Sequence, residues 1–230
     1  MNHSQPASQH RPNASAFTEA DFRARASAGL LAEPTDALFD PRTGRAIGRS
    51  DWDLDPELQA DLAAMERPRP AAVLVPVVLR AELTVLLTQR TDTLSSHAGQ
   101  IAFPGGRVDH SDADATAAAL REAHEEIGLE ARHIEPIGYL DGYRTGTGFH
   151  ITPVVALVRP GFELQLAPGE VADAFEVPLS FLMTDANHLQ HEREWRGRRR
   201  AFWAMPYGER YIWGATAGML KNLFDRLYAQ

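Results

Sequence analysis

Two short apolar runs, rich in β-branched residues and leucine, lie close together near residue 80. Residues 71–79 and 83–87 are separated only by Arg80-Ala81-Glu82. Runs of this length bounded by polar residues predict two buried strands, and the short spacer predicts a tight connection between them. Further strands are expected at 134–140, 151–158 and 174–178, with a hairpin across 195–198.

Three stretches carry helix signals. The first begins at Asp55-Pro56-Glu57, where an acidic cap precedes proline, and passes through Leu58, Leu62 and Met65 before the Arg-Pro-Arg-Pro at 67–70 stops it. The strongest spans 114–128, is rich in alanine and ends at a glycine suited to a left-handed cap. An amphipathic helix is expected at about 214–228, with one apolar side made of Leu220, Leu223, Phe224 and Leu227.

The order of these elements indicates the fold class. Strands flank the central helix on both sides, and another helix closes the chain, which predicts an α/β fold with a mixed sheet covered by helices. Residues 103–106, Phe-Pro-Gly-Gly, are expected to form a loop. We divide the chain into an extension (1–50), a helix with a Pro-rich linker (51–70) and a main domain (71–230).

The first fifty residues differ from the rest of the chain in composition and in hydrophobic pattern. They are rich in Ser, Ala, Pro, Asn and Gln and lack a sustained apolar period, so residues 1 to about 15 are expected to be disordered. They contain no apolar stretch typical of a signal peptide, and their acidic residues argue against a transit peptide. A cytoplasmic location is the default expectation.

Composition excludes several classes of protein. The chain has 230 residues and no cysteine, so a disulfide framework, a thiolate metal site and a cysteine nucleophile are ruled out. The longest apolar run, 71–79, contains Pro76 and is far shorter than the roughly 20 residues of a membrane span. The formal net charge of −8 argues against a protein whose main role is nucleic-acid binding but allows a phosphorylated substrate to be held through a divalent cation.

One face of the 114–128 helix is strongly acidic. At about 100° per residue, Glu122, Glu125 and Glu126 share one face, while the opposite side can pack into the core. The residues on that opposite side are Thr116, Leu120, Ala123 and Ile127. Like charges at this spacing repel each other, and only Arg121 is near enough to compensate.

Two interpretations of this face are open. It is either a solvated acidic surface or a site for a hard divalent cation, which carboxylate oxygens prefer to bind. The Pro-Gly-Gly turn just upstream favours the cation, because glycines let the backbone approach a metal or phosphate closely. Asp109, Asp112 and Asp114 in the connecting loop are further oxygen donors, with helix capping favoured for Asp112 or Asp114.

From Gly106 to Leu129 the chain resembles the Nudix box, the signature of hydrolases that act on a nucleoside diphosphate linked to another group. The match is carried by Arg121-Glu122-Ala123-His124-Glu125-Glu126-Ile127-Gly128-Leu129. The first half of the box is one residue longer than the usual pattern and has aspartates in place of the early glutamate. The resemblance implies a Nudix-type α/β/α sandwich with a mixed central sheet.

A second motif is similar to one found in the coenzyme A pyrophosphatase branch of that family, where the longer box also occurs. It consists of residues 86–90, Leu-Leu-Thr-Gln-Arg, and 97–106, His-Ala-Gly-Gln-Ile-Ala-Phe-Pro-Gly-Gly. Segments 169–170, 176–179 and 211–216 also resemble this branch. The implied reaction is hydrolysis of coenzyme A or its acyl derivatives to 4′-phosphopantetheine, or its acyl form, and 3′,5′-ADP.

The resemblance also implies roles for individual residues. Mg²⁺ or Mn²⁺ would be held by Glu122, Glu125, Glu126 and the Gly106 carbonyl. Glu122 or Glu125 would take the proton of the attacking water, with Glu170 as an outside candidate, and Arg121 would orient a glutamate. Substrate binding is expected at Arg90, His97, Gly99, Gln100, Phe103 and Gly105.

Several alternatives stay open. The alternative to coenzyme A is a Nudix hydrolase that acts on NADH, ADP-ribose or another nucleoside diphosphate derivative such as a sugar nucleotide. A second alternative, a non-catalytic nucleotide-sensing module, is disfavoured because all three box glutamates are present. The arginines of 193–203 suggest an exposed hairpin, with RNA binding or a seat for the 3′-phosphate of coenzyme A as alternatives. Apart from the resemblance, the residue type alone favours a hydrogen-bonded loop histidine for His97 and a helix-flank histidine for His124, with contact to phosphate or metal as the alternative for both. Residues 205–207 suggest core or dimer contacts, which leaves a homodimer open.

Overall fold

The computed structural model describes residues 17–35, 48–55, 68–92, 99–195 and 197–229. Three sequence predictions lie outside these ranges: the disordered N-terminus, the helix that follows Asp55, and the placement of His97. No helix within the described ranges is long and apolar enough to cross a membrane.

A mixed sheet of nine strands forms the centre of the described chain. Its main path follows the order β1, β7, β8, β2, β3, β4, with β5 beside β2, β6 beside β8 and β9 beside β3. The strands are β1 (Arg49–Ser50), β2 (Arg69–Val78), β3 (Thr84–Arg90), β4 (Ile101–Ala102), β5 (Gly105–Arg107), β6 (Ile134–Tyr139), β7 (Tyr143–Arg144), β8 (Phe149–Val158) and β9 (Val171–Pro178). β2 pairs in parallel with β8 and antiparallel with β3, so the expected mixed sheet is confirmed.

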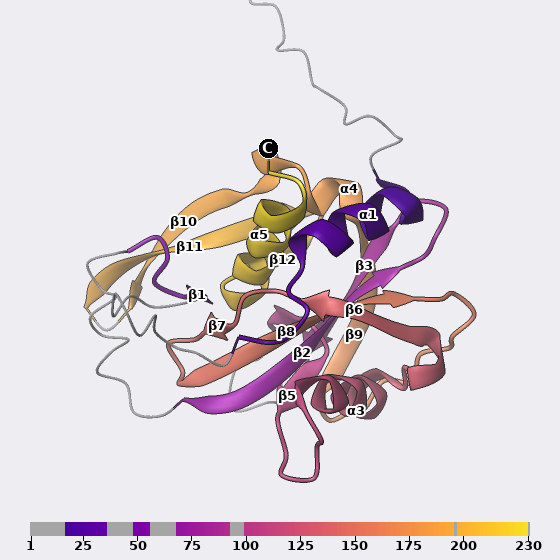
Figure 1. Cartoon of the computed structure of the whole chain (residues 1–230). Helices are drawn as coiled ribbons and strands as arrows, with labels where there is room; N and C mark the ends of the chain where they lie inside the picture. Colours follow the sequence, from indigo (N-terminus) through magenta and orange to yellow (C-terminus); the bar gives the residue numbers. More distant parts are fainter. Residues whose placement is uncertain (1–16, 36–47, 56–67, 93–98, 196, 230) are drawn as a thin grey trace, which may run out of the picture.

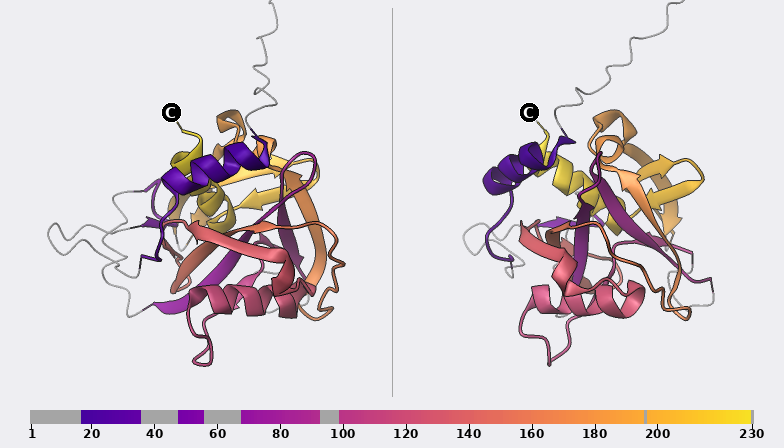
Figure 2. Two further views of the ribbon diagram at one scale, coloured as in Figure 1. Left: turned by 45° about the vertical axis from the view of Figure 1, so that its right-hand side comes forward. Right: turned by 90° about the vertical axis from the view of Figure 1, so that its right-hand side faces the viewer.

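Helices cover both faces of this sheet. They are α1 (Glu19–Gly29), α3 (Ala115–Ile127), α4 (Leu179–Leu182) and α5 (Ala215–Leu227), with short 3₁₀ turns η3 (Ala131–His133) and η4 (Asp185–Asn187). Figure 1 shows α3 below the sheet and α1 and α5 above it, and the two further views in Figure 2 keep this layering. The helices predicted at 114–128 and 214–228 are therefore confirmed as α3 and α5.

The apolar alternation in β2 explains why both faces are covered. Val73, Val75 and Val77 join the core cluster that contains α1 and α5, whereas Ala72 and Leu74 join the cluster that contains α3. Successive side chains of a strand point to opposite faces, so a continuous apolar run fits a strand buried on both sides.

A second, three-stranded sheet packs with α5. It contains β10 (Leu189–Trp195), β11 (Arg198–Tyr207) and β12 (Arg210–Trp213), in the order β10, β11, β12. The predicted hairpin is confirmed, because Trp195 pairs with Arg198 in the antiparallel β10–β11 register. Met205 is fully buried in the core, as expected for that segment.

The structure corrects the prediction of a loop at 103–106. Gly105 and Gly106 belong to β5, which pairs antiparallel with β2 through Val73–Gly105 and Ala72–Gly106. Glycine is a weak strand former, so the local sequence favours a turn. Here the ladder with β2 and close packing against α3 override that preference.

A helix also precedes the first one predicted. α1 lies within the segment that shows no apolar period, and only Phe22 and Ala26 of this helix are buried. Phe17, just before it, also joins the core and stacks on Tyr228 with ring centroids 5.3 Å apart. One buried pair at i, i+4 is too short a stripe to produce a detectable period.

Candidate active site

Helix α3 is fixed at both ends and along one side. Asp114 is its N-cap and accepts a hydrogen bond from the Ala117 amide at 2.8 Å, while Gly128 ends it in the left-handed conformation. Ala123 and Ile127 are fully buried against the sheet. This packing leaves the glutamates on the side of α3 that faces β5.

The three glutamates lie at different depths. Exposed side-chain fractions are 5% for Glu126, 17% for Glu122 and 57% for Glu125. The sequence places them on one face, but the depth of each depends on what packs above it. Gly105 and Gly106 of β5 contact Glu126 and Glu122, whereas Glu125 is exposed.

Glu126 is held directly by β5. Its Oε2 accepts a hydrogen bond from the Gly105 amide at 3.1 Å, and its Oε1 lies 3.8 Å from Nη1 of Arg90. Burial raises the pKa of Glu126 to about 7, and the hydrogen bond from Gly105 and the charge of Arg90 only partly oppose this rise. The charges of Glu122 and Glu170 raise the pKa further, so an added cation would stabilise the ionised form.

Glu122 lies directly behind Gly106. A Cβ atom added to Gly106 would lie 2.5 Å from the carboxyl carbon of Glu122, so any other residue here would displace the Glu122 carboxylate. Burial raises the pKa of Glu122, against the lowering effect of its hydrogen bond with Arg121. The Gly106 backbone and the Glu122 carboxylate are thus neighbours, as the resemblance implies.

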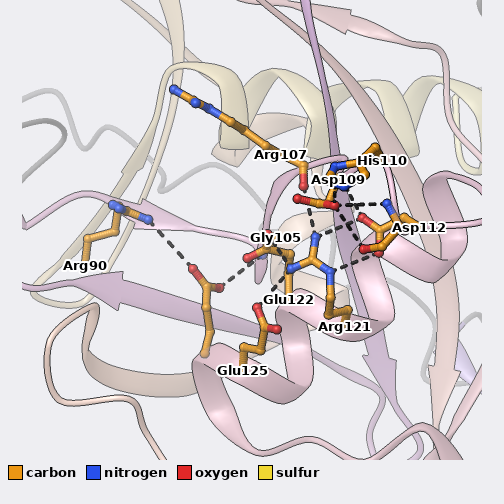
Figure 3. Close-up of polar contacts among 11 residues, drawn as sticks. Arg90, Gly105, Arg107, Asp109, His110, Asp112, Arg121, Glu122 and Glu125 are labelled. Atoms are coloured by element: carbon orange, nitrogen blue, oxygen red, sulfur yellow. Dashed lines mark hydrogen bonds and ion pairs between the residues drawn. The ribbon is translucent and has the colours of Figure 1, made fainter.

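Arg121 connects the glutamates to the loop before α3 (Figure 3). Its Nε and Nη2 donate to the two oxygens of Asp112 at 2.9 Å each, a bidentate pair. Its Nη1 donates to Glu122 at 3.0 Å and to Glu125 at 2.9 Å, and its Nη2 also donates to the Arg107 carbonyl at 3.1 Å. Hydrogen bonding to Arg121 lowers the pKa of Asp112, which therefore stays ionised.

A cavity of about 830 Å³ adjoins this cluster. It is lined by five of the residues expected to bind substrate, Arg90, Gly99, Gln100, Phe103 and Gly105, and by Gly106. The carboxylates do not line it, but Glu126 contacts Gly105 and Arg90, and Glu122 contacts Gly106. The second motif and the acidic helix therefore meet at one border of the cavity.

The other two candidates, His124 and Glu170, do not line the cavity, although the charge of Glu170 acts on Glu122 and Glu126. His124 is exposed on α3 and does not line the cavity. The Glu170 carboxyl group is exposed, and the backbone carbonyl of Glu170 accepts a hydrogen bond from the Thr91 amide at 3.0 Å. Within the described ranges no three acidic or histidine side chains form a ready-made metal site. Glu122 and Glu125 instead share Nη1 of Arg121.

The sequence reasoning missed part of the cavity wall. Residues 50–54 and 143–147 supply lining residues without any motif that marks them, because their role depends on tertiary packing alone. Residues 213–216 also line the cavity, and the segment 211–216 did carry a signal through its resemblance to the branch pattern. Thr216 donates a hydrogen bond to the Ile101 carbonyl at 3.0 Å, which ties this segment to the second motif.

Known proteins share sequence similarity with this chain. The NUDIX domain model matches residues 68–201. Proteins named uncharacterized Nudix hydrolase NudL are similar to the chain: that of Citrobacter koseri is 44% identical over 67% of this chain and 81% of the relative, and that of Escherichia coli K12 is 41% identical over the same shares.

Solved structures also match. A Caenorhabditis elegans Ap4A hydrolase binary complex has 24% identity and a TM-score of 0.40, covering 47% of this chain and 80% of that one. The NUDIX domain of Shewanella oneidensis NrtR in complex with ADP ribose has 23% identity and a TM-score of 0.40, covering 55% and 84%. The family model spans more than half of the chain, and NudL relatives share over 40% of the aligned residues, so the chain belongs to the Nudix hydrolase family.

Proposed function

We propose that the chain hydrolyses the phosphoanhydride of coenzyme A or its acyl derivatives in a reaction that depends on Mg²⁺ or Mn²⁺. The products are 4′-phosphopantetheine, or its acyl form, and 3′,5′-ADP. The observation that carries the proposal is the border where the α3 glutamates contact Gly105, Gly106 and Arg90, all of which line the cavity. The volume of about 830 Å³ falls within the usual range for sites that take an organic ligand.

The donor set fits a hard divalent cation. Nudix hydrolases generally use divalent metal ions, and Glu122, Glu125, Glu126 and the Gly106 carbonyl offer the oxygen ligands that such ions prefer. Burial and neighbouring negative charge raise the pKa of Glu122 and Glu126, so a cation would relieve an unfavourable arrangement. Glu125 would exchange its ion pair with Arg121 for the cation.

In the proposed hydrolysis, different residues accept a proton, orient a carboxylate and attract the diphosphate. When bound, a divalent cation neutralises the diphosphate oxygens and lowers the pKa of a coordinated water. Glu122 or Glu125 accepts the proton of the attacking water, and Arg121, which is anchored by Asp112, keeps the Glu122 carboxylate oriented. Arg90, which lines the cavity beside Glu126, attracts the diphosphate to this border.

A substrate panel tests the proposal. Purified protein with Mg²⁺ or Mn²⁺ is incubated with coenzyme A, an acyl-coenzyme A, NADH, ADP-ribose and a sugar nucleotide, and the products are identified by mass spectrometry. We expect the highest kcat/KM for coenzyme A or its acyl form. The assignment fails if coenzyme A ranks among the poorest substrates, and cleavage of none of the five would favour the non-catalytic nucleotide-sensing alternative.

A further inference from the structure

The cavity has a second cationic wall, on the side formed by the three-stranded sheet. Arg193 of β10 and Arg200 of β11 line the same cavity as Gly105, Gly106 and Arg107. Figure 1 shows the β10–β11 hairpin on the α5 side of the large sheet, opposite α3. The arginine hairpin is therefore not purely a solvated surface, because two of its arginines face a cavity shared with the candidate active site.

Tryptophan rings support these two arginines. The guanidinium of Arg200 lies 4.5 Å from the ring centroid of Trp52, and that of Arg193 lies 5.2 Å from the ring centroid of Trp213. Stacking holds a guanidinium by its flat face, so the N–H groups at its edge stay able to bind a planar or tetrahedral anion.

One nitrogen of the Arg200 guanidinium is a hydrogen-bond donor without an acceptor among the described residues. This nitrogen, Nη2, is buried. A buried donor without an acceptor is costly, and a phosphate oxygen would satisfy both the donor and the charge.

Two residues of the segment 48–55 hold Arg200 in position, Trp52 through its ring and Asp55 through the neighbouring Ala201. Trp52 is 4% exposed, and the Asp55 carboxylate accepts a hydrogen bond from the amide of Ala201, next to Arg200, at 3.1 Å. Trp52 and Asp55 lie before residue 68, where the match to the family model begins, whereas Arg200 lies within the match.

Two acidic side chains in the same wall are already engaged. Asp51 accepts hydrogen bonds from the Gly146 amide at 2.7 Å and from the Tyr143 hydroxyl at 3.0 Å. Asp53 accepts from the amide and hydroxyl of Ser50 at 2.9 Å each. These hydrogen bonds direct the carboxylate oxygens toward groups of the same chain. Four arginines also line the cavity and outnumber the two aspartates: Arg90, Arg107, Arg193 and Arg200.

We infer that Arg200, seated on Trp52, binds a second anionic group of the substrate, a phosphate monoester on the nucleoside, at a distance from the diphosphate that is cleaved. The inference rests on the proposed function, which places the scissile diphosphate at the α3 border. The substrate class is thereby narrowed to nucleoside diphosphate derivatives that carry a further phosphate, as coenzyme A does on its 3′ position.

A pair of substrates that differ by this phosphate tests the inference. We expect Arg200→Gln to raise KM for coenzyme A by between about 10- and 100-fold, with kcat little changed, and to leave KM for 3′-dephospho-coenzyme A within about threefold. Arg199→Gln is the matched control, because Arg199 is 87% exposed, pairs with Glu192 and does not line the cavity. Equal effects of Arg200→Gln on both substrates would overturn the inference.

Trp52 is a positioning residue in this account. Trp52→Phe keeps an aromatic face and is expected to retain most of the preference for coenzyme A over its dephospho form, whereas Trp52→Leu loses it. A preference that survives in Trp52→Leu, with the fold intact by circular dichroism, would remove Trp52 from the inference. Arg200→Lys serves as a second variant if Arg200→Gln does not fold, and it is expected to keep part of the preference.

A binding measurement separates this inference from the proposed function. Calorimetric titration with 3′,5′-ADP and 5′-AMP requires no turnover, so it stays informative even if no substrate is hydrolysed. We expect wild-type protein to bind 3′,5′-ADP about tenfold more tightly, and Arg200→Gln to abolish the difference. The inference is wrong if wild-type protein does not distinguish the two nucleotides, or if Arg200→Gln distinguishes them equally well.

Discussion

At the scale of single residues, Arg121 connects the carboxylates by hydrogen bonds to Asp112, Glu122 and Glu125. Its contacts with glutamates could be predicted from the sequence, because Arg121 adjoins Glu122 and lies one helical turn from Glu125. Its bidentate partner Asp112 could not be predicted, since the loop before α3 offers three aspartates and only its folded path selects one. Asp114, by contrast, caps the helix as the sequence favours.

Replacing Asp112 tests whether Arg121 needs this anchor. Asp112→Asn removes the negative charge from the bidentate pair, so the Arg121 side chain and the Glu122 carboxylate that it holds lose their fixed orientation. We expect kcat for coenzyme A hydrolysis to fall by about 10- to 100-fold. Asp114→Asn is the control, because asparagine caps a helix as well as aspartate does, and its kcat should match the wild type. Equal kcat values for the two variants would show that the anchor is dispensable.

At the scale of helices and strands, the segments that carry several local sequence signals could be predicted, and those without such signals could not. α3 has a cap, a strong helix-forming composition and a glycine stop, and the core strands β2 and β3 have apolar runs, so both kinds of element are readable from sequence. β5 consists of two glycines and an arginine, whose strand conformation exists only through pairing with β2. α1 buries only two residues, and its place against α5 depends on tertiary contacts.

A core substitution in α1 tests whether this helix belongs to the folded unit. Phe22 is fully buried in the cluster that contains α5, so Phe22→Ala should lower the free energy of unfolding by about 3–5 kcal/mol in urea denaturation. Ala24→Ser, on the exposed side of the same helix, should change it by less than about 0.5 kcal/mol. An unchanged midpoint for Phe22→Ala would mean that α1 does not contribute to the core.

Across the whole molecule, three separate parts of the chain meet around the cavity. The large sheet supplies the border with the glutamates, the β10–β12 sheet and α5 supply the opposite wall, and residues 48–55 complete it. Arg226 ties α5 to two segments behind the cavity wall: it donates to the Gly29 carbonyl at the end of α1 and to the carboxylate of Asp141. Such long-range contacts have no local pattern, which is why the sequence leaves the cavity wall incomplete.

The Arg226–Asp141 pair predicts a pH dependence of stability. Burial on its own would raise the pKa of Asp141, but hydrogen bonds from Arg226 and Asn222 outweigh it and lower the pKa below the ordinary 3.8. A lowered folded-state pKa gives stabilisation that is present above pH 4 and is lost as the pH falls through the folded-state value. Arg226→Met should therefore cost about 2–3 kcal/mol at pH 7 and much less at pH 2.5.

Urea denaturation at the two pH values measures this difference. Arg132→Met is the control, since Arg132 is 71% exposed and its pairing with Glu130 should contribute less than about 0.5 kcal/mol at either pH. A cost of Arg226→Met that is the same at both pH values would mean that packing of the side chain, and not its charge, stabilises the junction.

The most direct test of the central claim is the rate of coenzyme A hydrolysis at saturating Mg²⁺ by the wild type, Glu125→Gln and Glu130→Gln. Glu125 lies on the acidic face of α3, whereas Glu130 lies beyond its end and pairs with Arg132. We predict that Glu125→Gln lowers kcat by about 100-fold or more, because it removes a metal ligand or the general base, and that Glu130→Gln leaves kcat unchanged. An unchanged rate for Glu125→Gln would contradict the assignment of this helix face as the catalytic centre.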